Sequence, residues 1–141
     1  MKKVLFYAIA VILCIALLFA LFPLVERSFD RGRVSNVELG TGASERFSQD
    51  EIASAMNVVK ETFAEQRGWN DVLVSLWYSD NACSRREMER GGFDEDNTIV
   101  LFSDWYQGQG LFAERQPMPW TWILARESPT DAWVVIGGGK V

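Results

Sequence analysis

The stretch from Val4 to Val25 constrains the fold of this chain more than any other feature of its sequence. It holds 22 consecutive residues without a charge, whereas a helix on the surface of a globular domain needs a polar face. As a helix it would be about 33 Å long, close to the roughly 30 Å thickness of the hydrocarbon core of a bilayer. The sequence therefore predicts a transmembrane helix within residues 1–25.

The residues that flank this block indicate its processing and orientation. Lys2 and Lys3 precede it, as in a secretory signal. A cleaved signal would end in small residues at an A-x-A-like site, and the sequence from Phe22 to Glu26 offers none. We therefore expect an uncleaved signal anchor, with a cleaved signal as the alternative. Because a short N-terminal tail normally stays inside, we expect a single-pass protein of the cell membrane whose C-terminal domain is extracytoplasmic.

The composition of residues 26–141 excludes several classes of function. This part is long enough for one small domain and too short for two. It contains 12 basic and 19 acidic residues, a net charge of −7, which would repel a phosphate backbone, so no nucleic-acid partner is expected. The chain has no histidine, which excludes a Ser-His-Asp triad and a His-ligated zinc site.

A change in composition divides this part in two. Residues 26–45 are rich in Arg, Gly and Ser, which is typical of a linker. We therefore predict a signal anchor (1–25), a juxtamembrane linker (26–45) and an extracytoplasmic domain (46–141). Val37 and Leu39 alternate with polar residues, so a short strand is also compatible with the linker.

A capping box marks the start of the clearest predicted helix. The Ser48 oxygen can accept from the Glu51 amide while the Glu51 side chain reaches back to the Ser48 amide. The pattern predicts a helix over residues 49–66, which Gly68 would end. Lys60 and Glu61 are expected on its solvated face. The apolar positions recur at helical spacing and predict the side that faces the core: Ile52, Ala55, Met56, Val59 and Phe63.

Four later runs have the composition of β-strands. They span residues 71–79, 97–106, 120–126 and 133–136. The second is apolar on both phases, so we expect a central strand covered on both faces. A helix followed by closely connected strands favours an α+β fold, with one long amphipathic helix packed on a curved antiparallel sheet of about four strands.

Other segments between and after these strands carry local expectations. Residues 83–90 suit a short helix that Gly91 ends. Pro117 and Pro119 are expected to keep residues 116–119 out of the sheet. The glycines at 137–139 are expected to form a flexible tail.

The order of these segments resembles a family of bacterial envelope proteins that carry a signal or anchor and one small domain of unknown function. The resemblance covers about residues 46–136 and rests on five strings: RFSQDEIASAMNVVKETF, SLWYSD, NTIVLFSDWY, WTWILAR and WVV. It implies a cone-shaped α+β fold similar to nuclear transport factor two, in which a curved antiparallel sheet wraps a long helix. It implies no catalytic residues.

Six tryptophans are the most unusual feature of the predicted domain. Large rings can close the core of a small sheet, or they can line a pocket for sugars, peptides or cell-wall fragments. Trp120 and Trp122 are two residues apart, so on a strand they share one face.

Three polar residues give the second candidate for a site. Asp104 and Tyr106 share one phase of the central strand, and Arg126 ends the next. Inside a pocket, this trio would bind a carboxylate or act as a general acid or base; in an ordinary domain, Asp104 would pair with Arg126 or lie at the solvent end of its strand.

The acidic run at 94–96 lacks the spacing of an EF-hand, so we expect a solvated loop rather than a calcium site.

These observations favour a non-enzymatic accessory or ligand-binding module held at the cell surface. We expect no catalytic residue, no cofactor and no metal, and the partners are the membrane and an envelope protein or small molecule. A hydrolase or isomerase built around the polar trio is one alternative, and a regulatory subunit of a membrane complex is another. The candidate ligand-binding residues are Asp104, Tyr106, Trp120, Trp122 and Arg126.

Overall fold

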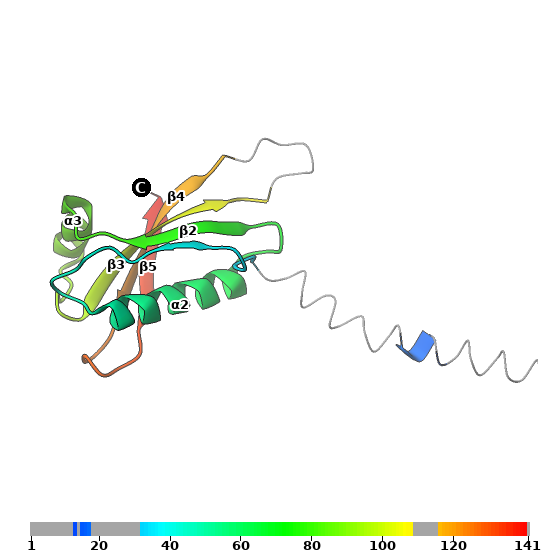
Figure 1. Ribbon diagram of the computed structural model, residues 1–141, viewed down its shortest axis with the longest axis horizontal. Helices are drawn as coiled ribbons and strands as arrows, with labels where there is room; N and C mark the ends of the chain where they lie inside the picture. Colours follow the sequence, from blue (N-terminus) through cyan, green and yellow to red (C-terminus); the bar gives the residue numbers. More distant parts are fainter. Residues whose placement is uncertain (1–12, 14, 18–31, 109–115, 141) are drawn as a thin grey trace, which may run out of the picture.

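A computed structural model of the chain describes residues 13, 15–17, 32–108 and 116–140. These residues form an α+β fold in which one long helix lies across a five-stranded sheet (Figure 1). The elements in chain order are β1 (Glu38–Gly40), α2 (Gln49–Gln66), β2 (Val72–Tyr78), α3 (Ala82–Gly91), β3 (Thr98–Tyr106), β4 (Met118–Ala125) and β5 (Val134–Lys140).

Helix α2 confirms the prediction made from the capping box. The Glu51 amide donates to the Ser48 Oγ at 3.3 Å, and the Ser48 amide donates to the Glu51 Oε2 at 2.9 Å. The backbone amides of Ser48 and Glu51 at the start of the helix are thereby both satisfied. The helix ends at Gln66, because Arg67 adopts an extended backbone while its amide still donates to the Phe63 carbonyl. All five residues predicted to face the core are buried.

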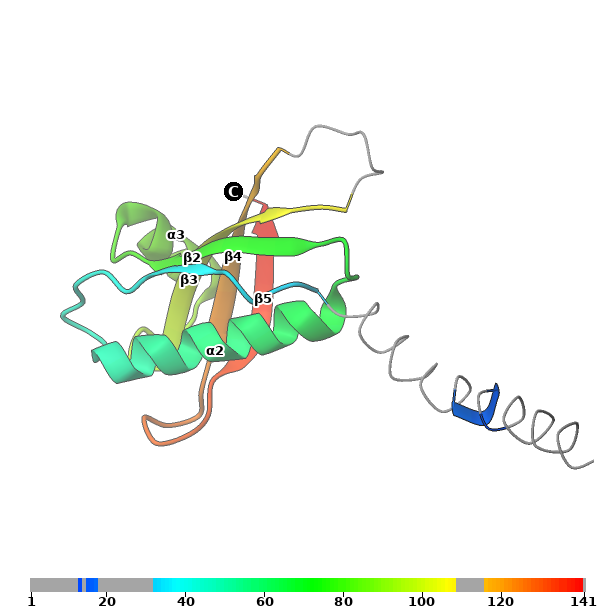
Figure 2. The ribbon, with the colours of Figure 1, turned by 45° about the vertical axis from the view of Figure 1, so that its right-hand side comes forward.

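The sheet has one more strand than predicted, and it is mixed rather than antiparallel. Its order is β1-β2-β3-β4-β5, and β1 lies parallel to β2, with Leu39 opposite Leu76. The reason is topological: α2 carries the chain back along the sheet, so the next strand runs in the direction of the first. Figure 2 shows β1 and β2 side by side above the helix. The other neighbouring strands are antiparallel, as expected.

Two segments predicted to lie outside the sheet belong to it. Pro119 is part of β4, opposite Asp104; the described part of β5 ends opposite Trp120, so Pro119 is not required to donate a hydrogen bond on that side. The glycines at 137–139 are not a flexible tail but part of β5, paired with residues 121–123 of β4. A Cβ at Gly138 would lie only 2.9 Å from the Trp120 Nε1 and 2.5 Å from the Thr121 carbonyl oxygen, so this position requires glycine.

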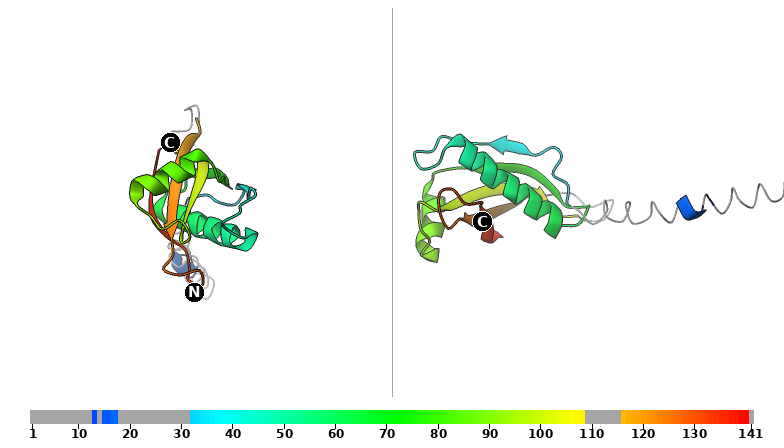
Figure 3. Two further views of the ribbon diagram at one scale, coloured as in Figure 1. Left: turned by 90° about the vertical axis from the view of Figure 1, so that its left-hand side faces the viewer. Right: turned by 90° about the horizontal axis from the view of Figure 1, so that it is seen from below.

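The two helices cover opposite faces of the sheet (Figure 3). Ile99, Leu101 and Trp105 of β3 belong to the main core under α2. Val100 and Phe102 point the other way and pack with the α3 side chain of Met88. Strand β3 is therefore central and buried on both faces, as its apolar run predicted.

The structure describes only part of the first 45 residues. Residues 32–45, predicted as a linker, contribute strand β1 and a bridge between Arg33 and Val72. The predicted signal anchor lies outside the described residues except for Leu13 and residues 15–17, which are helical. Across the ranges that the structure describes, no helix is both long enough and apolar enough to span a bilayer.

Candidate functional site

Asp104 and Tyr106 lie on the face of the sheet opposite α2. They continue the phase of Val100 and Phe102 along β3, past the region that α3 covers. Both are half-buried. The Ser75 Oγ on the neighbouring strand donates to the Asp104 Oδ2 at 3.4 Å. Asp104 therefore faces a polar neighbour, not the arginine that the sequence suggested.

The two tryptophans of β4 lie on the other face, under α2. They share that face, as predicted, and they contribute to the core. The Trp122 Nε1 donates to the buried Ser103 Oγ at 2.9 Å, which satisfies the only polar atom of the ring. Trp120 contacts the Trp105 ring edge-on, with 6.5 Å between ring centroids. Trp120 and Trp122 are thus packing residues and do not join Asp104 and Tyr106 in a pocket.

Arg126 lies at the opposite end of the sheet from Asp104. Its amide donates to the Asn97 carbonyl, just before β3 begins, and six residues along the strand, about 20 Å, separate Thr98 from Asp104. Arg126 therefore does not pair with Asp104, which was one of the arrangements that the sequence left open, and the polar trio does not converge.

The actual partner of Arg126 is Glu51, at the first turn of α2. The Arg126 Nη2 donates to the Glu51 Oε1 at 2.6 Å, with the arginine side chain only 5% exposed and the glutamate 31% exposed. The Arg126 Nη1 donates to the Pro129 carbonyl at 3.0 Å, and its guanidinium lies 4.3 Å from the centroid of the Trp133 ring. Arg126 thus links the β4–β5 connection to the first turn of α2 through hydrogen bonds to Pro129 and Glu51.

The electrostatics of Glu51 follow from these contacts. The pKa of its carboxyl is lowered from 4.5 to about 2, first by the hydrogen bond from the Ser48 amide, then by those from the Arg126 guanidinium and the Ser48 hydroxyl. All three donors favour the charged form. Sequence reasoning found the capping role of Glu51 but gave no signal for a partner 75 residues away.

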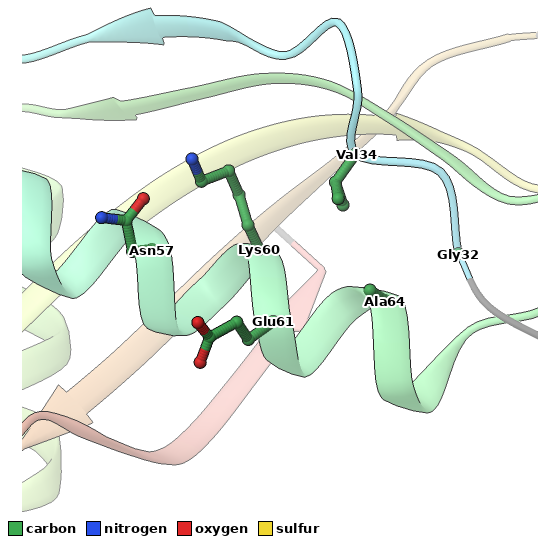
Figure 4. A pocket seen from close by; sticks show the side chains of 6 residues that line it. All are labelled: Gly32, Val34, Asn57, Lys60, Glu61 and Ala64. Carbon is green, nitrogen blue, oxygen red and sulfur yellow. The ribbon is translucent and has the colours of Figure 1, made fainter.

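A depression of about 480 Å³ opens on α2, where residues 32–34 cross the helix. Figure 4 shows the side chains of Asn57 and Lys60 rising from α2 on the side of the helix where Val34 lies, with the Lys60 ammonium directed away from Val34, whereas Glu61 lies on the other side. Within the described ranges, the side chains of Asn57, Lys60 and Glu61 form no hydrogen bond or ion pair. The lining residues are Gly32, Val34, Asn57, Lys60, Glu61 and Ala64.

The depression offers hydrogen-bond donors beside an apolar wall. The Lys60 ammonium carries three donors and the Asn57 amide two, while Val34 and Ala64 contribute apolar surface. This set suits a ligand that has an anionic group and an apolar part. The sequence placed Lys60 and Glu61 on a solvated helix face, because nothing in the helical pattern indicates that an earlier segment crosses that face.

Asp94, in the acidic run, has a structural role. The Asp94 carboxylate accepts from the Asn97 side chain at 2.8 Å and from the Asp96 amide at 3.1 Å; these hydrogen bonds lower its pKa. The acidic run thus closes a turn. In the described part of the chain, no three acidic or cysteine side chains gather in a way that would hold a metal ion.

Comparisons with protein-family models, with curated proteins and with solved structures found no match.

Proposed function

We propose that this chain is a membrane-anchored, non-enzymatic binding domain outside the cell membrane. It takes a ligand with an anionic group and an apolar part in the depression on α2. The observation that carries this proposal is that Asn57 and Lys60 line the depression together with Val34 and have no side-chain partner in the described part of the chain. Donors that no internal acceptor occupies are open to an external anion.

The anchor is supported by the apolar block itself. In its described residues, Leu13 is 63% and Leu17 is 65% exposed, so these side chains need an apolar environment other than the domain. A bilayer supplies that environment for a charge-free segment of this length.

The alternative of a hydrolase or isomerase has less support. It requires Asp104, Tyr106 and Arg126 in one pocket, and Arg126 instead lies at the far end of the sheet, paired with Glu51.

Introducing charge into the apolar block should release the protein from the membrane. Two arginines, Leu13→Arg and Leu17→Arg, should each oppose insertion by roughly 3 kcal/mol at the centre of a span. Full-length protein should stay in the membrane pellet after an alkaline carbonate wash, whereas the double variant should appear in the supernatant. Leu39→Arg, at an exposed site in β1, is the control and should stay in the pellet. Release of the wild-type protein would refute the anchor.

Reversing the charge of Lys60 should weaken binding of a carboxylate. With octanoate as the probe, Lys60→Glu should raise the Kd on the order of tenfold or more, since a charge-assisted hydrogen bond contributes about 1.5–3 kcal/mol. Calorimetric titration of the full chain in detergent measures this effect. Lys140→Glu, at the end of β5 and outside the depression, should leave the Kd unchanged. Equal weakening by both variants would indicate a general charge effect and not a site.

A further inference from the structure

The chain enters the described domain at the C-terminal end of α2. The Gly32 amide donates to the Ala64 carbonyl at 3.0 Å, and a Cβ at Gly32 would lie 2.9 Å from ring atoms of Phe63. The next residue, Arg33, donates through its amide to the Asp71 carbonyl at 2.9 Å. These bonds fix the entry point beside the turn that joins α2 to β2.

The length of chain before Gly32 limits how far this end can lie from the apolar block. Six residues, 26–31, separate Val25 from Gly32, so the two Cα atoms are at most about 25 Å apart. The opposite end of the domain, where Trp133 packs on Phe47, is farther by the length of α2, about 27 Å. If Val25 lies at the edge of the hydrocarbon core, the end at Gly32 is the one held near the bilayer.

The side chains at this end have the chemistry of a membrane interface. Trp69, in the turn after α2, is 47% exposed. The Arg67 guanidinium lies 4.3 Å from the centroid of the Trp105 ring and 5.7 Å from that of Trp120. Tryptophan is enriched where apolar surroundings meet water, and arginine binds phosphate groups.

We propose that the turn from Arg67 to Asp71 contacts the lipid headgroups of the membrane that holds the N-terminal anchor, with Trp69 as the inserted residue. This inference rests on the proposed membrane anchoring. It would fix the orientation of the domain on the bilayer and so the direction in which the depression on α2 faces.

The tryptophan fluorescence of the full chain can test this contact. All six tryptophans follow residue 68, so the predicted anchor adds no signal of its own. The full chain is reconstituted in phosphatidylcholine vesicles that contain a lipid with a nitroxide on its headgroup, and its emission is compared with that in unlabelled vesicles. We expect quenching of the wild-type protein, loss of most of that quenching in Trp69→Phe, and no loss in Trp133→Phe at the opposite end.

The outcomes separate this inference from the proposal on which it rests. Unchanged quenching in Trp69→Phe, or an equal loss in Trp133→Phe, would overturn the contact. A chain that floats with the vesicles and shows no quenching would also overturn it while leaving the anchor intact. A chain that does not float would refute the anchor, and the contact with it. If Trp133→Phe does not fold, Trp77→Phe, whose ring stacks on Phe102 on the α3 face, serves as the control.

Discussion

Replacing Phe63 with alanine is expected to lower the free energy of unfolding by about 3–5 kcal/mol. Phe63 is fully buried, and its ring meets the Trp105 ring edge-on with 5.8 Å between centroids. The ring also lies against Gly32, so the substitution removes packing from the helix, the central strand and the entry point at once. The cavity cannot collapse easily, because these three elements are fixed by separate hydrogen bonds.

Urea unfolding of the full chain in detergent, followed by tryptophan fluorescence, measures this loss. The signal comes from the domain alone, since the apolar block has no tryptophan. Leu39→Ala is the matched control: Leu39 is an exposed leucine of β1, and its truncation should change stability by less than about 0.5 kcal/mol. A loss below about 1 kcal/mol for Phe63→Ala would contradict the core described above.

Removing the Arg126 side chain is expected to cost about 2–3 kcal/mol at neutral pH. Arg126→Ala breaks the ion pair with Glu51, the hydrogen bond to Pro129 and the contact with the Trp133 ring. The loss should be smaller than for a fully buried pair, since water reaches Glu51 and screens the unpaired carboxylate. A loss below about 0.5 kcal/mol would show that the pair does not stabilise the fold.

The same pair predicts how stability depends on pH. The pKa of Glu51 is lowered from 4.5 to about 2 in the folded protein, so its stabilising contribution is fully present above about pH 4.5 and is lost as the pH falls toward 2. Unfolding curves between pH 6 and pH 3 should therefore show a decline that Glu51→Gln reduces. Asp131→Gln, in the exposed turn between β4 and β5, is the control and should keep the decline. An identical pH profile for wild type and Glu51→Gln would exclude this linkage.

Local patterns predicted the elements of the domain because the information for each lies within a few residues. The capping box and the apolar spacing placed α2 at its observed bounds, and the two-phase apolar run identified β3 as central. The predicted ends of two strands were wrong, because Pro119 and the glycines at 137–139 are poor strand formers by themselves. Their pairing with neighbouring strands overrides that preference.

The candidate site was predicted less well, because it depends on which distant segments meet. Asp104 and Arg126 each lie near the C-terminal end of a strand, and neighbouring antiparallel strands place those ends at opposite ends of the sheet, so the predicted antiparallel pairing already argued against their meeting. Lys60 has the pattern of any solvated helix position until residues 32–34 are seen to cross beside it. The resemblance to a family with cone-shaped folds, and the signal anchor, stay predictions.

The sequence by itself determined the helix, its cap, its buried face and the charge-free block, since each depends on periodicity or on contacts between residues close in the chain. Only the tertiary structure decided that β1 lies parallel to β2, that Arg126 pairs with Glu51, and that Trp120 and Trp122 face the helix rather than Asp104. Those features depend on contacts between residues tens of positions apart. Such contacts form because burying the apolar faces of α2 and the sheet brings distant segments together, and no short-range pattern records which ones will meet.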